Sequence, residues 1–340
     1  MLDFSCDYNV GAHDKVLRKL IETNSEKTAT YGLDKYSASA KEKIRAACGK
    51  EDARVWFLVG GTQTNATVIS AILAPFEGII AAETGHIETH EAGAIEYTGH
   101  KVITIPGHEG KILAADLADY LFGFENDETR DHMVKPGAVY ISQPTEYGTV
   151  YSKSELEEIS GICREHSILL YIDGARLGYA LASECDVTLP DIARLSDVFY
   201  IGGTKVGALF GEAVVISNPR LCPNFFTTIK QHGALLAKGR MLGVQFDALF
   251  TDNLYLEISK NAVSTAIRLR EGIIARGYKL YLESPTNQQF VIVDNEKLAA
   301  LREKIKFDIW EKKDSSHTVI RLVTSFATTD AEVDELLSLM

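Results

Sequence analysis

From about residue 54 onwards, short runs of apolar residues alternate with longer segments in which apolar residues recur with a helical period. Three strand-like runs are each followed by such a segment: Val55–Val59 by Thr62–Leu73, Lys101–Ile105 by Ala114–Phe124, and Ala138–Ser142 by Ser154–His166. This alternation is typical of βα units that build a mainly parallel sheet. The pattern therefore predicts an α/β fold in which helices flank a mainly parallel sheet.

The helix expected at Ser154–His166 has two sequence signals. Leu156 and Ile159 fall on one face of a helix, which gives that face an apolar stripe. Ser152 and Glu155 have the spacing of a capping box, in which each side chain bonds to the other residue's backbone. We therefore expect this helix to begin directly after Ser152.

Two further strand-like runs end in polar residues. Ile168–Ile172 leads to Asp173, and Asp197–Ile201 leads through two glycines and a threonine to Lys205. In open α/β sheets the ligand crevice lies beyond the carboxyl ends of the strands. A lysine that leaves a buried strand loses hydration, which lowers its pKa toward that of a nucleophilic amine. Asp173 and Lys205 are therefore candidate reactive groups, although Asp173 is also compatible with a simple helix N-cap.

The pattern of predicted elements changes after about residue 250. A helical segment at Asn253–Arg276 is followed by short strand-like runs at Tyr278–Leu282, Phe290–Val293 and Thr318–Leu322. A chain of 340 residues also suggests about two domains. We expect a large α/β domain over residues 1–250, with an N-terminal arm over about residues 1–15, and a smaller α+β domain over residues 251–340.

Charge and composition exclude several kinds of partner. Lys and Arg number 35 and Asp and Glu number 47, so a net charge of −12 gives no global positive field for nucleic acid or an anionic bilayer. Asp3 and Asp7 stand where a secretory signal needs basic and apolar residues, and no apolar run reaches the roughly 18 residues of a membrane helix. We expect a cytoplasmic protein with a small-molecule substrate. The cysteines, expected as free thiols without a metal site, are Cys6, Cys48, Cys163, Cys185 and Cys222.

A glycine-rich segment, Gly60-Gly61-Thr62-Gln63-Thr64-Asn65, lies between a predicted strand and a predicted helix. Backbone N–H groups and threonine hydroxyls at a helix N-terminus form an anion site suited to a phosphate. The segment has neither the dinucleotide fingerprint nor the P-loop pattern, so NAD and ATP are poor candidates. A plain glycine turn with Thr62 as the N-cap is the alternative.

Four motifs follow one another along the chain: Gly60-Gly61-Thr62, Gly85-His86-Ile87, Asp173-Gly174-Ala175-Arg176-Leu177 and Gly203-Thr204-Lys205. In this order and spacing they resemble the threonine aldolase and β-eliminating lyase family. The resemblance extends from the Ser5–Asp7 segment to Arg321, and the Asp-Gly-Ala-Arg-Leu element with its downstream lysine is its most specific part. It implies an enzyme that uses pyridoxal 5′-phosphate (PLP) and has the aspartate aminotransferase fold, also called fold type I.

The resemblance assigns roles to the residues of these motifs. Lys205 would hold the cofactor covalently, and Asp173 would pair with the pyridine nitrogen and keep it protonated, which makes the ring an electron sink. Arg176 matches the family arginine that faces the cofactor's phenolic oxygen. Gly61 and Thr62 would hold the phosphate.

His86 matches the family histidine that stacks on the pyridine ring near the scissile bond. A polar surface histidine is the alternative, because His90, His100 and His108 lie nearby in the sequence. A second family histidine is missing, because the segment after Ala138–Ser142 reads Gln143-Pro144-Thr145-Glu146-Tyr147-Gly148. Glu146, Tyr147 or a water held by His86 would then accept the substrate's proton, or the substrate differs from threonine.

Further site residues are implied outside these motifs. Arg321 matches the family arginine that binds the substrate's α-carboxylate, to which a guanidinium offers bidentate geometry. Ser5 would assist the same carboxylate, unless it is a plain loop serine. Tyr31 matches a family tyrosine that reaches the active site of a neighbouring subunit. Lys238 and Arg240 would contribute to the cofactor phosphate region across the interface, unless they lie on a solvated helix face.

The implied reaction is retro-aldol cleavage of a β-hydroxy-α-amino acid, such as L-threonine or L-allo-threonine, to glycine and an aldehyde. Lys205 and Asp173 would serve equally in β-elimination, transamination or cleavage of phenylserine-like substrates, so these reactions stay open. The presence of both Lys205 and Arg321 disfavours a non-catalytic binding protein, and the absent glycine fingerprint disfavours a nicotinamide oxidoreductase. Sites that borrow residues across an interface imply a homodimer or a homotetramer.

Overall fold

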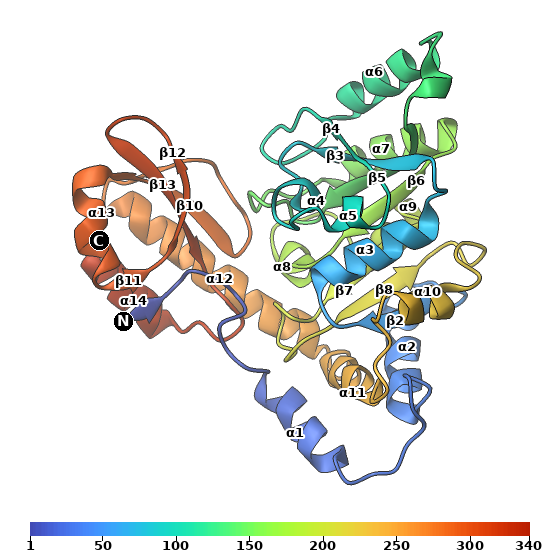
Figure 1. Cartoon of the computed structure of the whole chain (residues 1–340). Helices are drawn as coiled ribbons and strands as arrows, with labels where there is room; N and C mark the ends of the chain where they lie inside the picture. The colour runs from blue at the N-terminus through green and yellow to red at the C-terminus, as the bar shows by residue number, and fades with distance from the viewer.

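The computed structural model describes residues 1–340, and its centre is a seven-stranded sheet with the order β2-β8-β7-β6-β5-β3-β4 (Figure 1). The strands are β2 Arg54–Leu58, β3 Glu77–Ala82, β4 Val102–Ile105, β5 Lys135–Ser142, β6 Leu169–Asp173, β7 Val198–Gly202 and β8 Glu212–Ile216. β8 pairs antiparallel with both of its neighbours, and the other neighbouring pairs are parallel. The predicted mainly parallel sheet is confirmed.

Helices cover both faces of this sheet, because successive strand residues point to opposite sides. Tyr171 and Ile172, for example, belong to different buried clusters. One face packs against α3 Gly61–Ile72, α4 His86–Thr89, α5 Ala94–Tyr97 and α10 Phe225–Gln231. The other face packs against α1 Asp14–Thr23, α2 Lys35–Ala47, α6 Ala114–Glu125, α7 Lys153–Glu165, α8 Leu177–Ala182, α9 Leu189–Leu195 and α11 Arg240–Leu249. A short 3₁₀ turn, Arg130–His132, precedes β5.

The C-terminal part is built on a second sheet, with the antiparallel order β12-β13-β10-β9. Its elements are α12 Leu254–Ala275, β9 Lys279–Leu280, β10 Gln288–Asp294, α13 Asn295–Arg302, β11 Ile305–Lys306, β12 Asp308–Lys312, β13 His317–Val323 and α14 Asp330–Leu339. β1, Leu2–Asp3, pairs with β11, and Phe4 joins the buried cluster of this part. The first residues of the chain therefore pack with the last ninety, and both termini lie on that side (Figure 1).

Several local predictions can be compared with the structure. Ser152 and Glu155 form the capping box of α7, and α12 spans nearly the whole predicted segment 253–276, so both predictions are confirmed. The sequence pattern predicted neither β3 nor β8. β8 follows β7 directly in the chain and pairs antiparallel with it, so no crossover helix marks it in the sequence. The alternative reading of Thr62 as a helix N-cap is wrong, since α3 begins at Gly61 with Gly60 as its N-cap. No helix combines the length and apolar character that crossing a bilayer requires.

The end of β7 approaches the loop after β6 closely at Gly202. The Gly202 N–H donates to the carbonyl of Gly174 at 2.9 Å, and a Cβ on Gly202 would lie 2.1 Å from the carbonyl oxygen of Ala175. We expect Gly202→Ala to lower the free energy of unfolding in urea by about 1–3 kcal/mol through overpacking. Gly161→Ala is the control, because Gly161 has open space in α7 and gains about 0.4–1 kcal/mol. Equal stabilities of the two variants would contradict this packing.

Candidate active site

A cavity of about 280 Å³ opens at the carboxyl ends of β5, β6 and β7. Residues from the strand ends and the loops beyond them line it: Tyr8, Gly61, Thr62, His86, Ser142, Pro144, Thr145, Glu146, Asp173, Ala175, Arg176, Tyr200, Thr204, Lys205 and Glu212. Six predicted site residues therefore meet here, namely Gly61, Thr62, His86, Asp173, Arg176 and Lys205. The sheet edge expected from the sequence is the edge that holds the cavity.

Asp173 ends β6 and is only 4% exposed. One carboxylate oxygen, Oδ1, accepts from the Tyr200 hydroxyl at 2.5 Å and from the Ala175 N–H at 2.9 Å. The other, Oδ2, accepts from the Tyr140 hydroxyl at 2.6 Å and from Asn65 Nδ2 at 3.0 Å. Asp173 does not cap a helix, because α8 begins after Arg176.

These donors decide the charge of Asp173. Burial acts to raise its pKa, but the nearby His86 and the hydrogen bonds from Tyr140 and Tyr200 hold the pKa of the carboxyl below its usual range. Burial and the charge of Asp173 in turn raise the pKa values of Tyr140 and Tyr200, so these hydroxyls stay protonated and donate. The cavity therefore holds a buried negative charge at neutral pH.

A chain of hydrogen bonds joins Asp173 to His86. Asn65 of α3 is fully buried, and its Nδ2 donates to Asp173 at 3.0 Å and to Glu91 Oε1 at 2.7 Å. Glu91 Oε1 also lies 2.8 Å from His86 Nδ1. A carboxylate partner makes Nδ1 the donor, so in the neutral ring the other nitrogen, Nε2, is the one that can accept a proton. His86 is therefore not an isolated surface histidine.

Lys205 follows β7 and approaches the ring of Tyr8, with Nζ 5.9 Å from the ring centroid. Burial first, and then the positive charge of Arg176, lower the pKa of the Lys205 amine. Asp7, Asp173 and Glu212 act in the opposite direction. A larger fraction of Lys205 is therefore uncharged and nucleophilic at neutral pH than for a lysine in water.

Arg176 is held by a carboxylate that sequence reasoning did not select. Its Nε donates to Asp7 Oδ2 at 2.7 Å and its Nη2 donates to Asp7 Oδ1 at 3.1 Å. Asp7 is fully buried and also accepts from Asn287 Nδ2 at 2.9 Å. Although burial acts to raise it, the charges of Arg176 and Lys205 hold the pKa of Asp7 below its usual range. The N-terminal arm thus contributes the counter-charge of Arg176.

A second cavity of about 590 Å³ adjoins the first and shares Tyr8, His86, Glu146, Arg176 and Lys205 with it. Arg321 of β13 lines this second cavity together with Asp308 and Trp310. Arg321 Nη2 donates to Asp308 Oδ2 at 2.5 Å, and its Nη1 donates to Gln288 Oε1 at 3.1 Å. Its Nε is buried without a partner. Arg321 is therefore brought to the same crevice as Lys205, from the other sheet.

Glu146 lies where the two cavities meet, on the loop after β5. Its Oε1 accepts from the Ser142 hydroxyl at 2.6 Å and from the backbone N–H of His86 at 3.1 Å. Burial raises the pKa of Glu146, against the lowering effect of Ser142. Tyr147, the other candidate in this segment, packs edge-on against Trp310 with ring centroids 5.1 Å apart. Glu146 is thus the better placed of the two to face both cavities.

Four predicted site residues lie outside both cavities. Ser5 donates its hydroxyl to Asp3 at 2.6 Å. The other three gather on a different part of the chain. Tyr31 has a left-handed φ of 58°, is 37% exposed and donates its backbone N–H to the carbonyl of Ala237 at 3.0 Å. Arg240 donates to the backbone oxygen of Glu26 at 2.9 Å, and Lys238 is exposed beside it.

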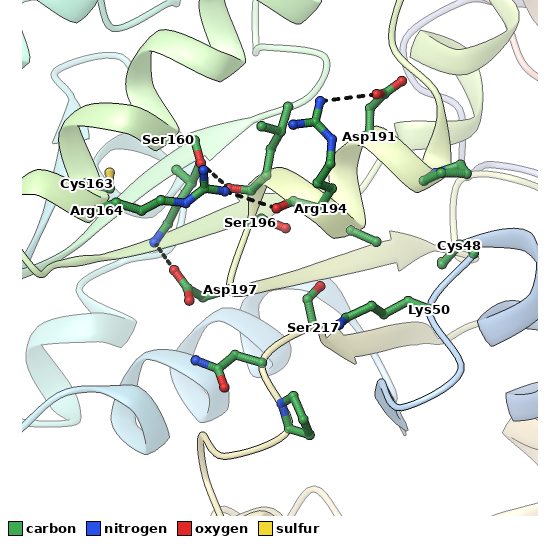
Figure 2. A pocket seen from close by; sticks show the side chains of 17 residues that line it. Cys48, Lys50, Ser160, Cys163, Arg164, Asp191, Arg194, Ser196, Asp197 and Ser217 are labelled. Atoms are coloured by element: carbon green, nitrogen blue, oxygen red, sulfur yellow. Dashed lines mark hydrogen bonds and ion pairs between the residues drawn. The ribbon is translucent and has the colours of Figure 1, made fainter.

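A hollow of about 640 Å³ lies at the opposite end of the strands, near the starts of β6 and β7 (Figure 2). Its charged side chains bond within the protein: Arg164 Nη2 donates to the carbonyl of Arg194 at 3.1 Å, and Asp197 Oδ2 accepts from the N–H of Leu170 at 3.0 Å. None of the predicted site residues lines it. This hollow therefore offers no convergent chemical groups, despite its size.

Sequence reasoning missed the residues that hold the reactive groups in place. They are Asp7, Tyr8, Asn65, Glu91, Tyr140, Tyr200, Glu212, Asp308 and Trp310. Some carried a signal, since Asn65 ends the glycine-rich segment and Tyr200 lies two residues before Gly202. The partners of Asp7 and Glu91 are set by tertiary packing, for which one sequence has no signal.

The Asp7–Arg176 pair can be tested by removing its carboxylate. Asp7→Ala leaves the guanidinium buried and unpaired, so we expect a loss of about 3–5 kcal/mol in the free energy of unfolding at neutral pH. Because folding lowers the pKa of Asp7, its contribution is present above the ordinary carboxyl pKa of about 4 and is lost as the pH falls below it.

The matched control is Asp334→Ala. Asp334 accepts three hydrogen bonds from Arg268, of 2.7, 2.9 and 3.1 Å, but both side chains are about half exposed. Exposed pairs contribute little, so this variant should unfold almost as the wild type does. A comparable loss in both variants would show that burial does not matter at Asp7.

Comparisons with known proteins agree with this geometry. The family model described as Beta-eliminating lyase matches residues 3–296. The low specificity L-threonine aldolase of a Pseudomonas species is 31% identical, over 88% of this chain and 87% of its own length. A solved threonine aldolase of Leishmania major is 45% identical and covers 100% of this chain and 98% of its own, with a TM-score of 0.96. Aspartate aminotransferase of Thermus thermophilus, at 17% identity and a TM-score of 0.70, shares the fold, which is therefore that of the fold type I enzymes. The chain belongs to the β-eliminating lyase family.

Proposed function

We propose that this protein is a PLP-dependent lyase that cleaves a β-hydroxy-α-amino acid, L-threonine or L-allo-threonine, to glycine and an aldehyde. The observation that carries the proposal is the meeting of a buried, ionised Asp173 and an amine of lowered pKa, Lys205, in one cavity. The relatives named threonine aldolase agree with it. The second family histidine is still absent, so the substrate's hydroxyl is handled by other groups.

The donor set of the cavity fits PLP. The N-terminus of α3 at Gly61 and Thr62 presents N–H groups for the phosphate, and Asp173 supplies the carboxylate for the pyridine nitrogen. Lys205 would bind the cofactor covalently, and His86 would lie against its ring. When bound, PLP supplies an electron sink for the electrons released from the substrate's Cα. Arg176 would lie beside the ring with its charge balanced by Asp7.

Arg321 would bind the α-carboxylate of the amino acid. Asp308 now occupies one edge of the guanidinium, but Asp308 is 45% exposed in its side chain and can give way to a substrate carboxylate. A planar guanidinium fixes a carboxylate through two bonds, which orients the bond to be broken. Ser5, bonded to Asp3, would have to turn to assist, so its role stays a prediction.

His86 would accept the proton of the substrate's β-hydroxyl at Nε2, directly or through a water. Glu91 keeps the proton of the ring on Nδ1, and Asn65 ties Glu91 to Asp173. Glu146 lines the same cavities as His86, and its pKa is raised. Its carboxyl would therefore hold a proton while the site is restored after the aldehyde leaves. Removal of the hydroxyl proton lets the Cα–Cβ bond break and release the aldehyde.

We also propose that the working form is an oligomer, a homodimer or a homotetramer, in the cytoplasm. Tyr31, Lys238 and Arg240 lie together away from the cavities of their own chain. Such a cluster suits a contribution to a partner's site.

Residues 1–250 and 251–340 would form two domains whose closure changes the distance between Lys205 and Arg321.

The first test is product formation. With added PLP, we expect purified protein to release acetaldehyde and glycine from L-threonine or L-allo-threonine, and Lys205→Ala to lose this activity because no amine remains to hold the cofactor. Lys297→Ala, which removes an exposed lysine of α13, is the control and should retain full activity. A keto acid in place of glycine and aldehyde would point to β-elimination or transamination instead.

The second test concerns the proton acceptor. His86→Gln should lower kcat by about 10²–10⁴-fold, the usual contribution of general base catalysis. His108→Gln is a matched control, because His108 also lies 2.8 Å from a carboxylate, that of Asp116, but at the surface. Steady-state kinetics at several pH values measures both variants. An unchanged kcat for His86→Gln would show that another group, such as Glu146, accepts the proton.

A further inference from the structure

Glu212 is a carboxylate that the mechanism above does not use. It is 3% exposed and begins β8. Across the sheet it pairs with Leu58 of β2 on one side and with Gly202 of β7 on the other. β2 leads to the N-terminus of α3 at Gly61, and β7 leads to Lys205. Glu212 therefore lies between the loop that would hold the phosphate and the loop that carries the lysine, and it lines their common cavity.

The hydrogen-bond partners of Glu212 are both neutral. The N–H of Gly203 donates to Oε2 at 3.0 Å, and the Thr204 hydroxyl donates to Oε1 at 2.7 Å. The Thr204 oxygen in turn accepts from the N–H of Gly211 at 2.9 Å. A buried carboxylate with neutral partners binds protons tightly, and burial raises the pKa of Glu212 to about 8.

Other titratable groups surround Glu212 on every packed element. The Lys205 amine lowers the pKa of Glu212, and the Asp173 carboxylate raises it. The charge of Glu212 also acts to raise the pKa values of three tyrosines, Tyr171 of β6, Tyr200 of β7 and Tyr255 of α12. These three tyrosines have raised pKa values and stay neutral at ordinary pH. Lys205 and Asp173 are therefore the charges whose effects must be separated from that of Glu212.

We propose that Glu212, where it is still ionised, takes up one proton when the phosphate group of the cofactor binds, and that the neutral acid then directs the Thr204 hydroxyl toward the phosphate. The proposal rests on the proposed function, which places a phosphate at Gly61. A dianionic phosphate and an ionised carboxylate in one cavity would repel each other, and one proton from solvent removes that repulsion. Because Oε2 accepts from Gly203, the proton belongs on Oε1, and the Thr204 hydroxyl becomes free to donate to the phosphate.

The test uses pyridoxine 5′-phosphate, which carries the phosphate but has no aldehyde to react with Lys205. Calorimetric titration of the full chain in buffers with different heats of ionisation measures the number of protons taken up on binding. Wild type, Glu212→Gln and Glu212→Asp are compared from roughly pH 6.5 to 9.5. This range spans the pKa of Glu212 in the protein without ligand, which is about 8. Asp247→Asn, which alters a buried carboxylate of α11 that pairs with Lys43, is the matched control.

Wild type should take up as much as one more proton per site than Glu212→Gln above about pH 8, and an equal number well below it, where Glu212 is already protonated. The affinity of wild type relative to Glu212→Gln should fall by as much as about tenfold per pH unit in the upper range. Repeating the comparison in a Lys205→Ala background removes the titration of the Lys205 amine, so the difference then isolates Glu212. Glu212→Asp and Asp247→Asn should behave as wild type does.

Three results would overturn the proposal. Equal proton uptake by wild type and Glu212→Gln would remove Glu212 as the acceptor while leaving the proposed function intact. If Glu212→Gln does not fold, wild type titrated with pyridoxine decides, because uptake that persists without the phosphate contradicts the proposal. Failure of wild type to bind pyridoxine 5′-phosphate at any pH would overturn the proposed function as well.

Discussion

A single buried negative charge, the carboxylate of Asp173, sets the requirements for the rest of the site. An ionised carboxylate out of water is costly unless hydrogen-bond donors replace its hydration. Two tyrosine hydroxyls, one amide and one backbone N–H supply them. Because each donor comes from a different strand, helix or loop, the charge fixes how those elements meet. Asp173 is thereby prepared to meet a cation in the cavity, as a protonated pyridine ring would be.

The parallel sheet makes this arrangement possible. Tyr140, Tyr171 and Tyr200 stand on the same face of three neighbouring strands, and Asp173 stands one step further along that face. Strands of the same direction end at the same edge, so the groups that follow them converge. The neighbouring antiparallel strand adds Glu212 at that edge from the other direction. The second sheet brings Arg321 across the crevice, so one part of the chain suits the cofactor and the other suits the substrate.

The sequence made the α/β fold and the central reactive groups predictable, because apolar periodicity and strand ends are local features. Asp173 and Lys205 follow their strands directly, and the motifs around them resemble one family closely. Asp7 meets Arg176 across 169 residues, and no local pattern encodes that pairing. Glu91 and Glu212 are likewise ordinary glutamates in the sequence, and only burial makes them chemically important. Positions that would serve a partner subunit, such as Tyr31, could be proposed from the family resemblance alone.

The most direct measurement is ¹⁵N NMR of bound PLP that is labelled at the pyridine nitrogen, in wild type and in Asp173→Asn. An ionised Asp173 at the base of the cavity predicts a protonated pyridine nitrogen in wild type throughout the neutral pH range. The isosteric amide keeps the shape but removes the charge, so the nitrogen should lose its proton in the variant. A nitrogen that is unprotonated in wild type, or equally protonated in both proteins, would contradict a site organised around this charge.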